Sequence, residues 1–148
     1  MASFNNLNDL AKYVQKDINK VLNKEVASSV EDALIEAVDE TIYQSGDPLF
    51  YNRRGLSPSS TGLGGREQMY HDPVTNGVLE VTDLAEPSKQ WDVDLDSMLV
   101  EGYGNKEEWW NKPRDFYETA RETLEKHGYH LDAMQEGLNK LGYKVTRG

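Results

Sequence analysis

The chain has 148 residues, of which 26 are acidic and 16 basic, so its formal net charge is −10; a chain of this size fits one domain. It contains no cysteine, which excludes disulfides, thiolate catalysis and cysteine-based zinc sites, and its charge disfavours a nonspecific grip on DNA phosphates. With a hydrophobic share of 37 % and a mean hydropathy of −0.74, we expect a fold that exposes much of its length or shares a core with neighbours.

The first predicted element is a helix over residues 7–43, which contain neither Gly nor Pro. Its apolar residues recur every three or four positions in two runs whose phases differ by one residue: Leu7, Leu10, Val14, Ile18 and Val21, then Val26, Val30, Leu34, Val38 and Ile42. Ser29 and Asp32 resemble a weak capping box, which predicts a kink or restart near residues 27–29. We expect the helix to end at residues 46–48.

This helix is also divided by charge. Lys12, Lys16, Lys20 and Lys24 recur every four residues, whereas residues 25–46 contain no base. One interpretation is a solvated helix face. The other is an exposed arm whose lysine stripe meets an acidic neighbour, because two-signed helices suit head-to-tail or ring contacts.

The middle of the chain predicts a small antiparallel sheet. The segments "GREQMYHD" and "VLEVTDLA" flank Asn76-Gly77, which is a tight-turn signal. Asp92, Asp94 and Asp96 resemble the start of a calcium loop, but Ser97 and Tyr103 stand where such a loop needs Gly and Glu. We therefore expect no metal there.

Two helices are predicted near the C-terminus. The first starts at Pro113, lines one face with Phe116, Ala120 and Leu124, and closes at residues 127–128. The second places Leu131, Met134, Leu138 and Leu141 on one face, with Gly142 as its C-cap, and "YKVTR" is expected to form a short final strand. The predicted class is thus α+β, with residues 1–46 as a helical arm or part of the same domain and residues 47–148 as the core.

Catalytic motifs are missing from the sequence. It has no GxSxG, HExxH or P-loop, and His127 and His130 flank Gly128, so that they need not share a face as metal ligands would. We expect a protein that is not an enzyme and binds no cofactor or metal. A hydrolase or metal enzyme built on His71, His127 or His130 is kept as an alternative.

Three short motifs resemble those of the tail-completion proteins of long-tailed bacteriophages. "YNRR" with a later "GL" is similar to a "YxRR…GL" element that is typical of phages of Gram-positive hosts, "MLVEGYG" to an "iEyG" element, and "NKPRDFYETARETL" to a "PRpF" helix start. They occur in the family's order over residues 49–127. The residues that carry the resemblance, together with a tryptophan pair, are Tyr51, Arg53, Arg54, Gly62, Leu63, Glu101, Gly102, Trp109, Trp110, Pro113, Arg114 and Phe116.

The resemblance implies a small α+β subunit of the phage head–tail joining region. It would be made in the host cytoplasm, placed in the virion, and assembled as a homo-oligomeric ring, hexameric or dodecameric. Such a ring docks on other neck and tail proteins and lets DNA pass without specific binding, with no role for a membrane. No catalytic residue is implied.

Several features of the sequence bear on this interpretation. Residues 80–109 carry 2 bases and 9 acids, a net −7 that would suit either a DNA-repelling lumen or solubility before assembly. One of Trp109 and Trp110 is a candidate interface anchor, because adjacent rings cannot face the same way. One of Arg53 and Arg54 is expected to pair with Asp39 or Glu40, and the other, with residues 57–65, to reach a neighbouring subunit.

Two other functions remain open. The chain could be a tail terminator or head-closure subunit of the same neck. It could instead be an acidic binding module that masks a basic partner surface, such as a DNA mimic, although the lysine stripe argues against a uniformly acidic one.

Overall fold

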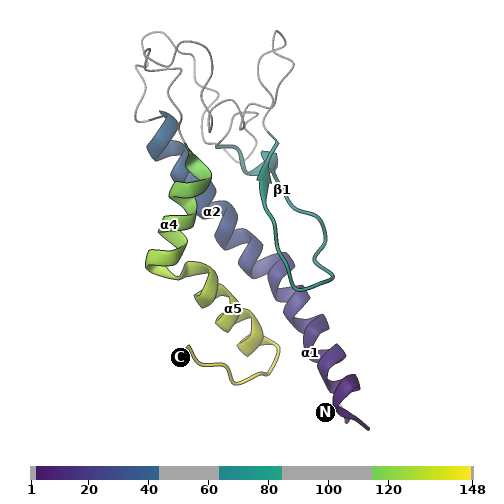
Figure 1. The fold of residues 1–148 in the computed structure, drawn as a ribbon. Helices are drawn as coiled ribbons and strands as arrows, with labels where there is room; N and C mark the ends of the chain where they lie inside the picture. The colour runs from purple at the N-terminus through teal and green to yellow at the C-terminus, as the bar shows by residue number, and fades with distance from the viewer. Residues whose placement is uncertain (1–2, 44–63, 85–114, 148) are drawn as a thin grey trace. The chain divides into compact units, whose positions relative to one another are not determined.

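The computed structural model describes residues 3–43, 64–84 and 115–147. It confirms the predicted fold class: a long N-terminal helical segment, a small antiparallel sheet of two strands, and two C-terminal helices (Figure 1). The chain divides into two compact units. Unit 1 contains Met1–Ser29, His71–Glu80 and Gly128–Gly148, and unit 2 contains Val30–Tyr70 and Val81–His127. The domain boundary predicted between residues 46 and 47 lies outside the described residues.

The N-terminal helical segment consists of four consecutive elements: α1 (Leu7–Val21), the π-helix η1 (Leu22–Val26), α2 (Ala27–Val38) and the π-helix η2 (Asp39–Tyr43). Asn6 caps α1, because its side-chain oxygen accepts a hydrogen bond of 2.9 Å from the backbone N–H of Asp9. The predicted helix end at residues 46–48 lies outside the described part of the chain.

The π-helix η1 explains the change of phase in the apolar pattern. Val21 and Val26 are five residues apart, and both are buried; a π-helix bonds residues five apart and so brings them to one face. The α-helix α2 begins at Ala27, where the sequence predicted a kink or restart, but it follows directly on η1 and not on a capped break. Asp32 does not cap a new helix; its carboxylate accepts from Arg66 instead.

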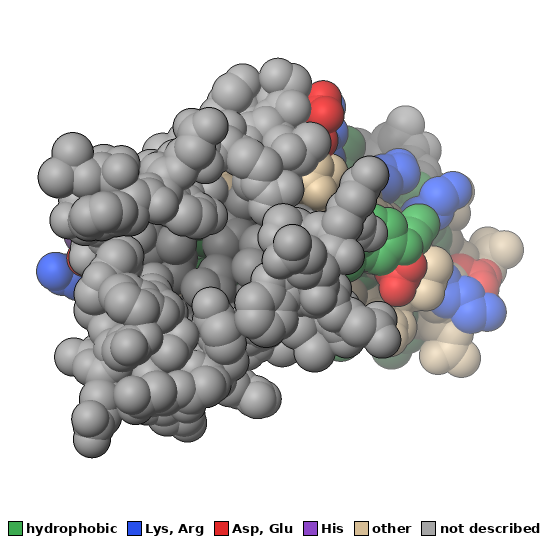
Figure 2. Space-filling model, turned by 90° about the horizontal axis from the view of Figure 1, so that it is seen from above, with side chains coloured by type: hydrophobic (Ala, Val, Ile, Leu, Met, Phe, Trp, Pro, Cys, Tyr) green, Lys and Arg blue, Asp and Glu red, His purple; other side chains and the backbone are tan. Residues whose placement is uncertain are grey.

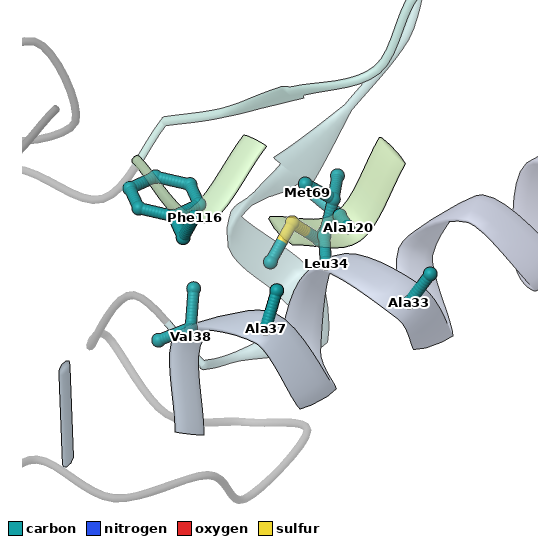
Figure 3. Close-up of a cluster of buried hydrophobic side chains, with 7 residues drawn as sticks. All are labelled: Ala33, Leu34, Ala37, Val38, Met69, Phe116 and Ala120. Atoms are coloured by element: carbon teal, nitrogen blue, oxygen red, sulfur yellow. The ribbon is translucent and has the colours of Figure 1, made fainter. Parts of the chain in front are cut away.

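Unit 2 is organised around a cluster of buried apolar side chains. The helix α4 (Phe116–His127) begins after Asp115, whose Oδ1 accepts from the N–H of Glu118 at 2.9 Å. Its buried face, with Phe116 0 % exposed, confirms the predicted packing face of this helix. Figure 3 shows Ala37 and Val38 of α2 pointing toward the same space as Phe116 and Met69. The buried members are Ala33, Leu34, Ala37, Val38, Met69, Phe116 and Ala120.

The sheet of unit 2 is shorter than the sequence predicted. The 3-10 helix η3 (Arg66–Gln68) leads into β1 (Met69–Tyr70), which pairs with β2 (Thr82–Asp83) so that Met69 faces Asp83. The chain bends at Asn76 and Gly77, with Gly77 at φ +77°, but this bend does not join the strands directly. Residues 71–80 between the strands belong to unit 1, where their backbone groups bond to α1 and η1.

Unit 1 contains α5 (Tyr129–Lys140), which contacts α1 and η1. Gly142, at φ +97°, ends it as predicted: the N–H of Gly142 donates to the carbonyl of Asn139 and that of Tyr143 to Leu138, the pattern of a Schellman motif. The predicted final strand in "YKVTR" is wrong. Val145 bonds to the side chains of Gln135 and Asn139, so its backbone pairs with α5 and not with a strand.

Candidate interaction surface

The apolar stripe of α1 is covered at one end and open at the other. Val21, at its C-terminal end, is 2 % exposed, whereas Leu7 is 82 % exposed and Leu10 39 %. Tyr13 is also 45 % exposed, and its ring stacks obliquely on Phe4 with centroids 5.1 Å apart. The first turns of α1 therefore present apolar side chains to solvent.

The lysine stripe lies on the same helix. Lys12, Lys16, Lys20 and Lys24 are all exposed. Within the described part of the chain, only Lys20 of these four forms an ion pair, with Asp17 at 2.9 Å. Three of the lysines line an open groove of about 700 Å³ that runs between α1 and the loop at Val74 and Thr75. In the space-filling view of Figure 2, blue Lys and Arg side chains gather beside green hydrophobic ones on the described part of the surface.

Two asparagines hold the loop that forms the far wall of this groove. The side chain of Asn23 bonds to both backbone groups of Val74: its Oδ1 accepts from the N–H at 2.8 Å and its Nδ2 donates to the carbonyl at 3.3 Å. Asn19 Oδ1 accepts from the N–H of Gly77 at 3.0 Å. Sequence reasoning missed both residues; the signal was the amide row of Gln15, Asn19 and Asn23, spaced by four on one helix face.

A buried carboxylate anchors the C-terminal segment of unit 1. Asp17 is 6 % exposed; it accepts from Lys20 and, at 2.9 Å, from the hydroxyl of Tyr143. These two hydrogen bonds, that of Lys20 foremost, hold the pKa of Asp17 below its ordinary value of 3.8. Burial and the neighbouring Asp17 raise the pKa of the Tyr143 hydroxyl. The segment after α5 is thereby tied to α1.

An acidic stripe occupies α2 and η2. Asp32, Glu36 and Glu40 are four residues apart and all exposed. Arg66 donates to Asp32 and, at 2.9 Å, to Glu31. Glu36 and Glu40 take part in no ion pair among the residues that the structure describes. We call this set the acidic stripe, and the set of Lys12, Lys16, Lys20 and Lys24 the lysine stripe.

Most residues of the predicted site fall outside the described ranges. Only Phe116 can be placed: it is fully buried in the core of unit 2, where it contacts Tyr117 with ring centroids 4.4 Å apart. Those outside are Tyr51, Arg53, Arg54, Gly62, Leu63, Glu101, Gly102, Trp109, Trp110, Pro113 and Arg114. The predicted arginine pairing with Asp39 or Glu40 and most of the acidic segment 80–109 likewise involve residues outside those ranges.

The histidines do not form a recognisable centre. His71 Nδ1 lies 3.1 Å from the carbonyl of Asp72, and His127 is exposed at the end of α4. The Nδ1 of His130 is buried without a hydrogen-bond partner in the described part of the chain. In the same residues, no three His, Cys, Asp or Glu side chains converge on a point where a metal ion could bind. None of the described helices combines the length and apolar character that a bilayer crossing requires.

The described residues form a small, mostly helical α+β protein, with the lysine stripe in unit 1 and the acidic stripe in unit 2. Comparison with protein families then identifies its relatives: residues 6–140 match the model of the YomN family. The chain belongs to the YomN family, a phage-derived family, and is a phage protein. No curated protein and no solved structure matches the chain.

Proposed function

We propose that the protein is a structural component of the virion, placed in the head–tail joining region as a tail-completion or neck protein. It acts by assembling as a ring that docks the tail to the head and lets DNA pass, and it catalyses no reaction. The observation that carries this proposal is membership of a phage-derived family across nearly the whole described chain, together with the three motifs that resemble tail-completion proteins.

The open surface of α1 supports assembly. In α1, Leu7 is 82 % and Leu10 39 % exposed, so their apolar surface stays in contact with water. Covering this surface with another molecule would be favourable, because removing apolar surface from water lowers the free energy. The lysine stripe on the same helix would determine which partner binds there and in which orientation, because complementary charge selects both the partner and the register of the contact. A protein that works by docking needs both features.

Particles made without this protein test the proposal. Loss of a completion protein predicts full heads beside separate, finished tails, visible by electron microscopy, and mass spectrometry of normal virions is expected to detect the chain. Overlong tails would instead favour a tail terminator of the same neck. A strictly monomeric protein that is absent from mature virions would contradict the proposal.

The second candidate is an acidic module that masks a basic partner, favoured by the net charge of −10. It predicts tight, stoichiometric and salt-sensitive binding to a DNA-binding protein. Capture experiments with the purified chain at low and high salt would separate this function from a virion role.

A further inference from the structure

We infer that the lysine stripe of one copy docks on the acidic stripe of a second copy of the same chain, head to tail. This inference rests on the proposed assembly and deepens it by naming the two surfaces that meet. The occupant is specified by charge complementarity: one stripe carries four ammonium groups, the other three carboxylates, and both belong to every copy.

The geometry of the stripes matches. Lys12, Lys16, Lys20 and Lys24 are four residues apart, as are Asp32, Glu36 and Glu40. Of these residues, Lys12, Lys16 and Lys20 lie in α1, and Asp32 and Glu36 lie in α2. Residues four apart in an α-helix form a ridge of fixed inclination, and successive members rise by about 6 Å. Two ridges with the same spacing and inclination can therefore bring several opposite charges together at once.

Both stripes are available for this contact. All seven side chains are exposed. Within the described residues, no ion pair is formed by Lys12, Lys16, Lys24, Glu36 or Glu40. Asp32 accepts from Arg66 through its Oδ1, which leaves its Oδ2 to accept from a partner. Because the two surfaces differ, the contact is heterologous, and repetition of such a contact produces a ring when the rotation closes.

Charge reversal in the full-length protein tests the contact. Sedimentation of the purified chain at low salt is expected to show self-association that weakens as salt is added. The variants K12E/K16E and E36K/E40K are each expected to raise the dissociation constant at least about tenfold, since each turns attraction into repulsion. Their equimolar mixture is expected to associate again, because the reversed stripe of one variant then faces the reversed stripe of the other.

Matched controls separate the stripes from net charge. The double variants K126E/K144E and E67K/E122K make the same changes of net charge at exposed positions outside the stripes, and both are expected to leave association unchanged. Circular dichroism verifies that every variant is folded. Equal weakening by the controls, no rescue in the mixture, or a wild-type chain that remains monomeric would overturn the inference.

Virion incorporation and self-association, measured side by side, separate a failure of this inference from a failure of the proposed function. Virions carrying each variant are analysed by mass spectrometry for the chain. If the chain is in the virion but self-association ignores both stripes, only the inference fails. If stripe-dependent association occurs in a chain that no virion contains, the proposed function fails and the inference stands. If K12E/K16E lowers incorporation without changing self-association, an acidic partner other than a second copy occupies the stripe, and the inference is wrong.

Discussion

Gly137 shows how one residue sets the distance between two helices. It is buried on α5, and a Cβ at this position would overlap Cγ1 of Val21 and lie 3.0 Å from Cγ2. Val21 is β-branched and fully buried, so it has little freedom to move aside. The sequence alone could not identify this glycine as a contact point, because nothing in the local pattern of α5 distinguishes it from a helix-weakening residue.

Replacement of Gly137 by Ala is expected to destabilise unit 1 by about 1–3 kcal/mol, the usual cost of overpacking a tight contact. Thermal unfolding followed by circular dichroism measures it. In the double variant with Val21→Ala, the methyl group gains space, so the combined loss is expected to be smaller than the sum of the single losses. Strict additivity would show that the two residues do not constrain each other. Lys140→Ala, exposed on the same helix, serves as the control.

The Asp17–Tyr143 pair predicts a dependence of stability on pH. The pKa of Asp17 is lowered in the folded protein, so its contribution is present above pH 3.8 and is lost as the pH falls through the folded value. The pKa of Tyr143 is raised, so its contribution is present below pH 10.0 and is lost as the pH rises through the folded value. Melting temperatures are expected to be highest between these limits.

Tyr143→Phe tests this dependence. In this variant, the fall of the melting temperature at alkaline pH is expected to lose the part that is due to Tyr143. The fall at acid pH is expected to be smaller, because Asp17 then keeps only its hydrogen bond to Lys20. Tyr129→Phe, at an exposed tyrosine of α5, is expected to retain both. Identical pH profiles for Tyr143→Phe and the wild type would show that the hydrogen bond to Asp17 does not contribute to stability.

Among the elements, η1 is the one whose presence is most informative. An extra residue in the helix would normally rotate everything after it by about 100°. Here the apolar pattern itself contains the extra residue, as the step from Val21 to Val26. The π-helix therefore brings Val21 and Val26, at the junction of the two runs, to one buried face, and the phase shift in the sequence was its signal.

Deletion of Lys24, an exposed residue within η1, is expected to leave a stable, regular helix, because the apolar residues then fall into one α-helical pattern. Deletion of Lys16, exposed in the α-helical part of α1, is the matched control. This deletion is expected to lower the melting temperature clearly, because it shifts the apolar pattern on one side of the deleted residue and turns buried side chains toward solvent. Each buried side chain that becomes exposed costs about 1.5–3 kcal/mol of stability. Equal destabilisation by the two deletions would contradict this explanation.

On the scale of the whole molecule, the net charge bears on which partners the protein is expected to bind. The chain has 10 more acids than bases, and four of its seven described lysines form the lysine stripe. In the contact that we infer, the lysine stripe pairs with carboxylates and does not neutralise phosphates. The acidic remainder favours repulsion between the protein and nucleic acid.

We therefore expect the purified protein not to bind duplex DNA at about 0.15 M salt, since no net release of counterions would drive the association. Electrophoretic mobility or fluorescence anisotropy with labelled duplexes measures this. A lysine-rich protein of similar size is the positive control. Retention of DNA that disappears in the K12E/K16E variant would show that the lysine stripe binds phosphate, and would contradict the expectation.

The sequence by itself determined the order and type of the main elements. Helical spacing and the glycines at 128 and 142 are local signals, because each reflects the backbone preferences of the residues at that place. It also indicated the lysine stripe, because four-residue spacing is a property of one helix. The length of the strands, the failure of "YKVTR" to form a strand and the contact at Gly137 were decided only by tertiary structure. Each depends on contacts that a local sequence pattern does not contain. The side chains of Asn19 and Asn23 bond to the backbone of the loop at residues 74–77. Those of Gln135 and Asn139 bond to the backbone of Val145.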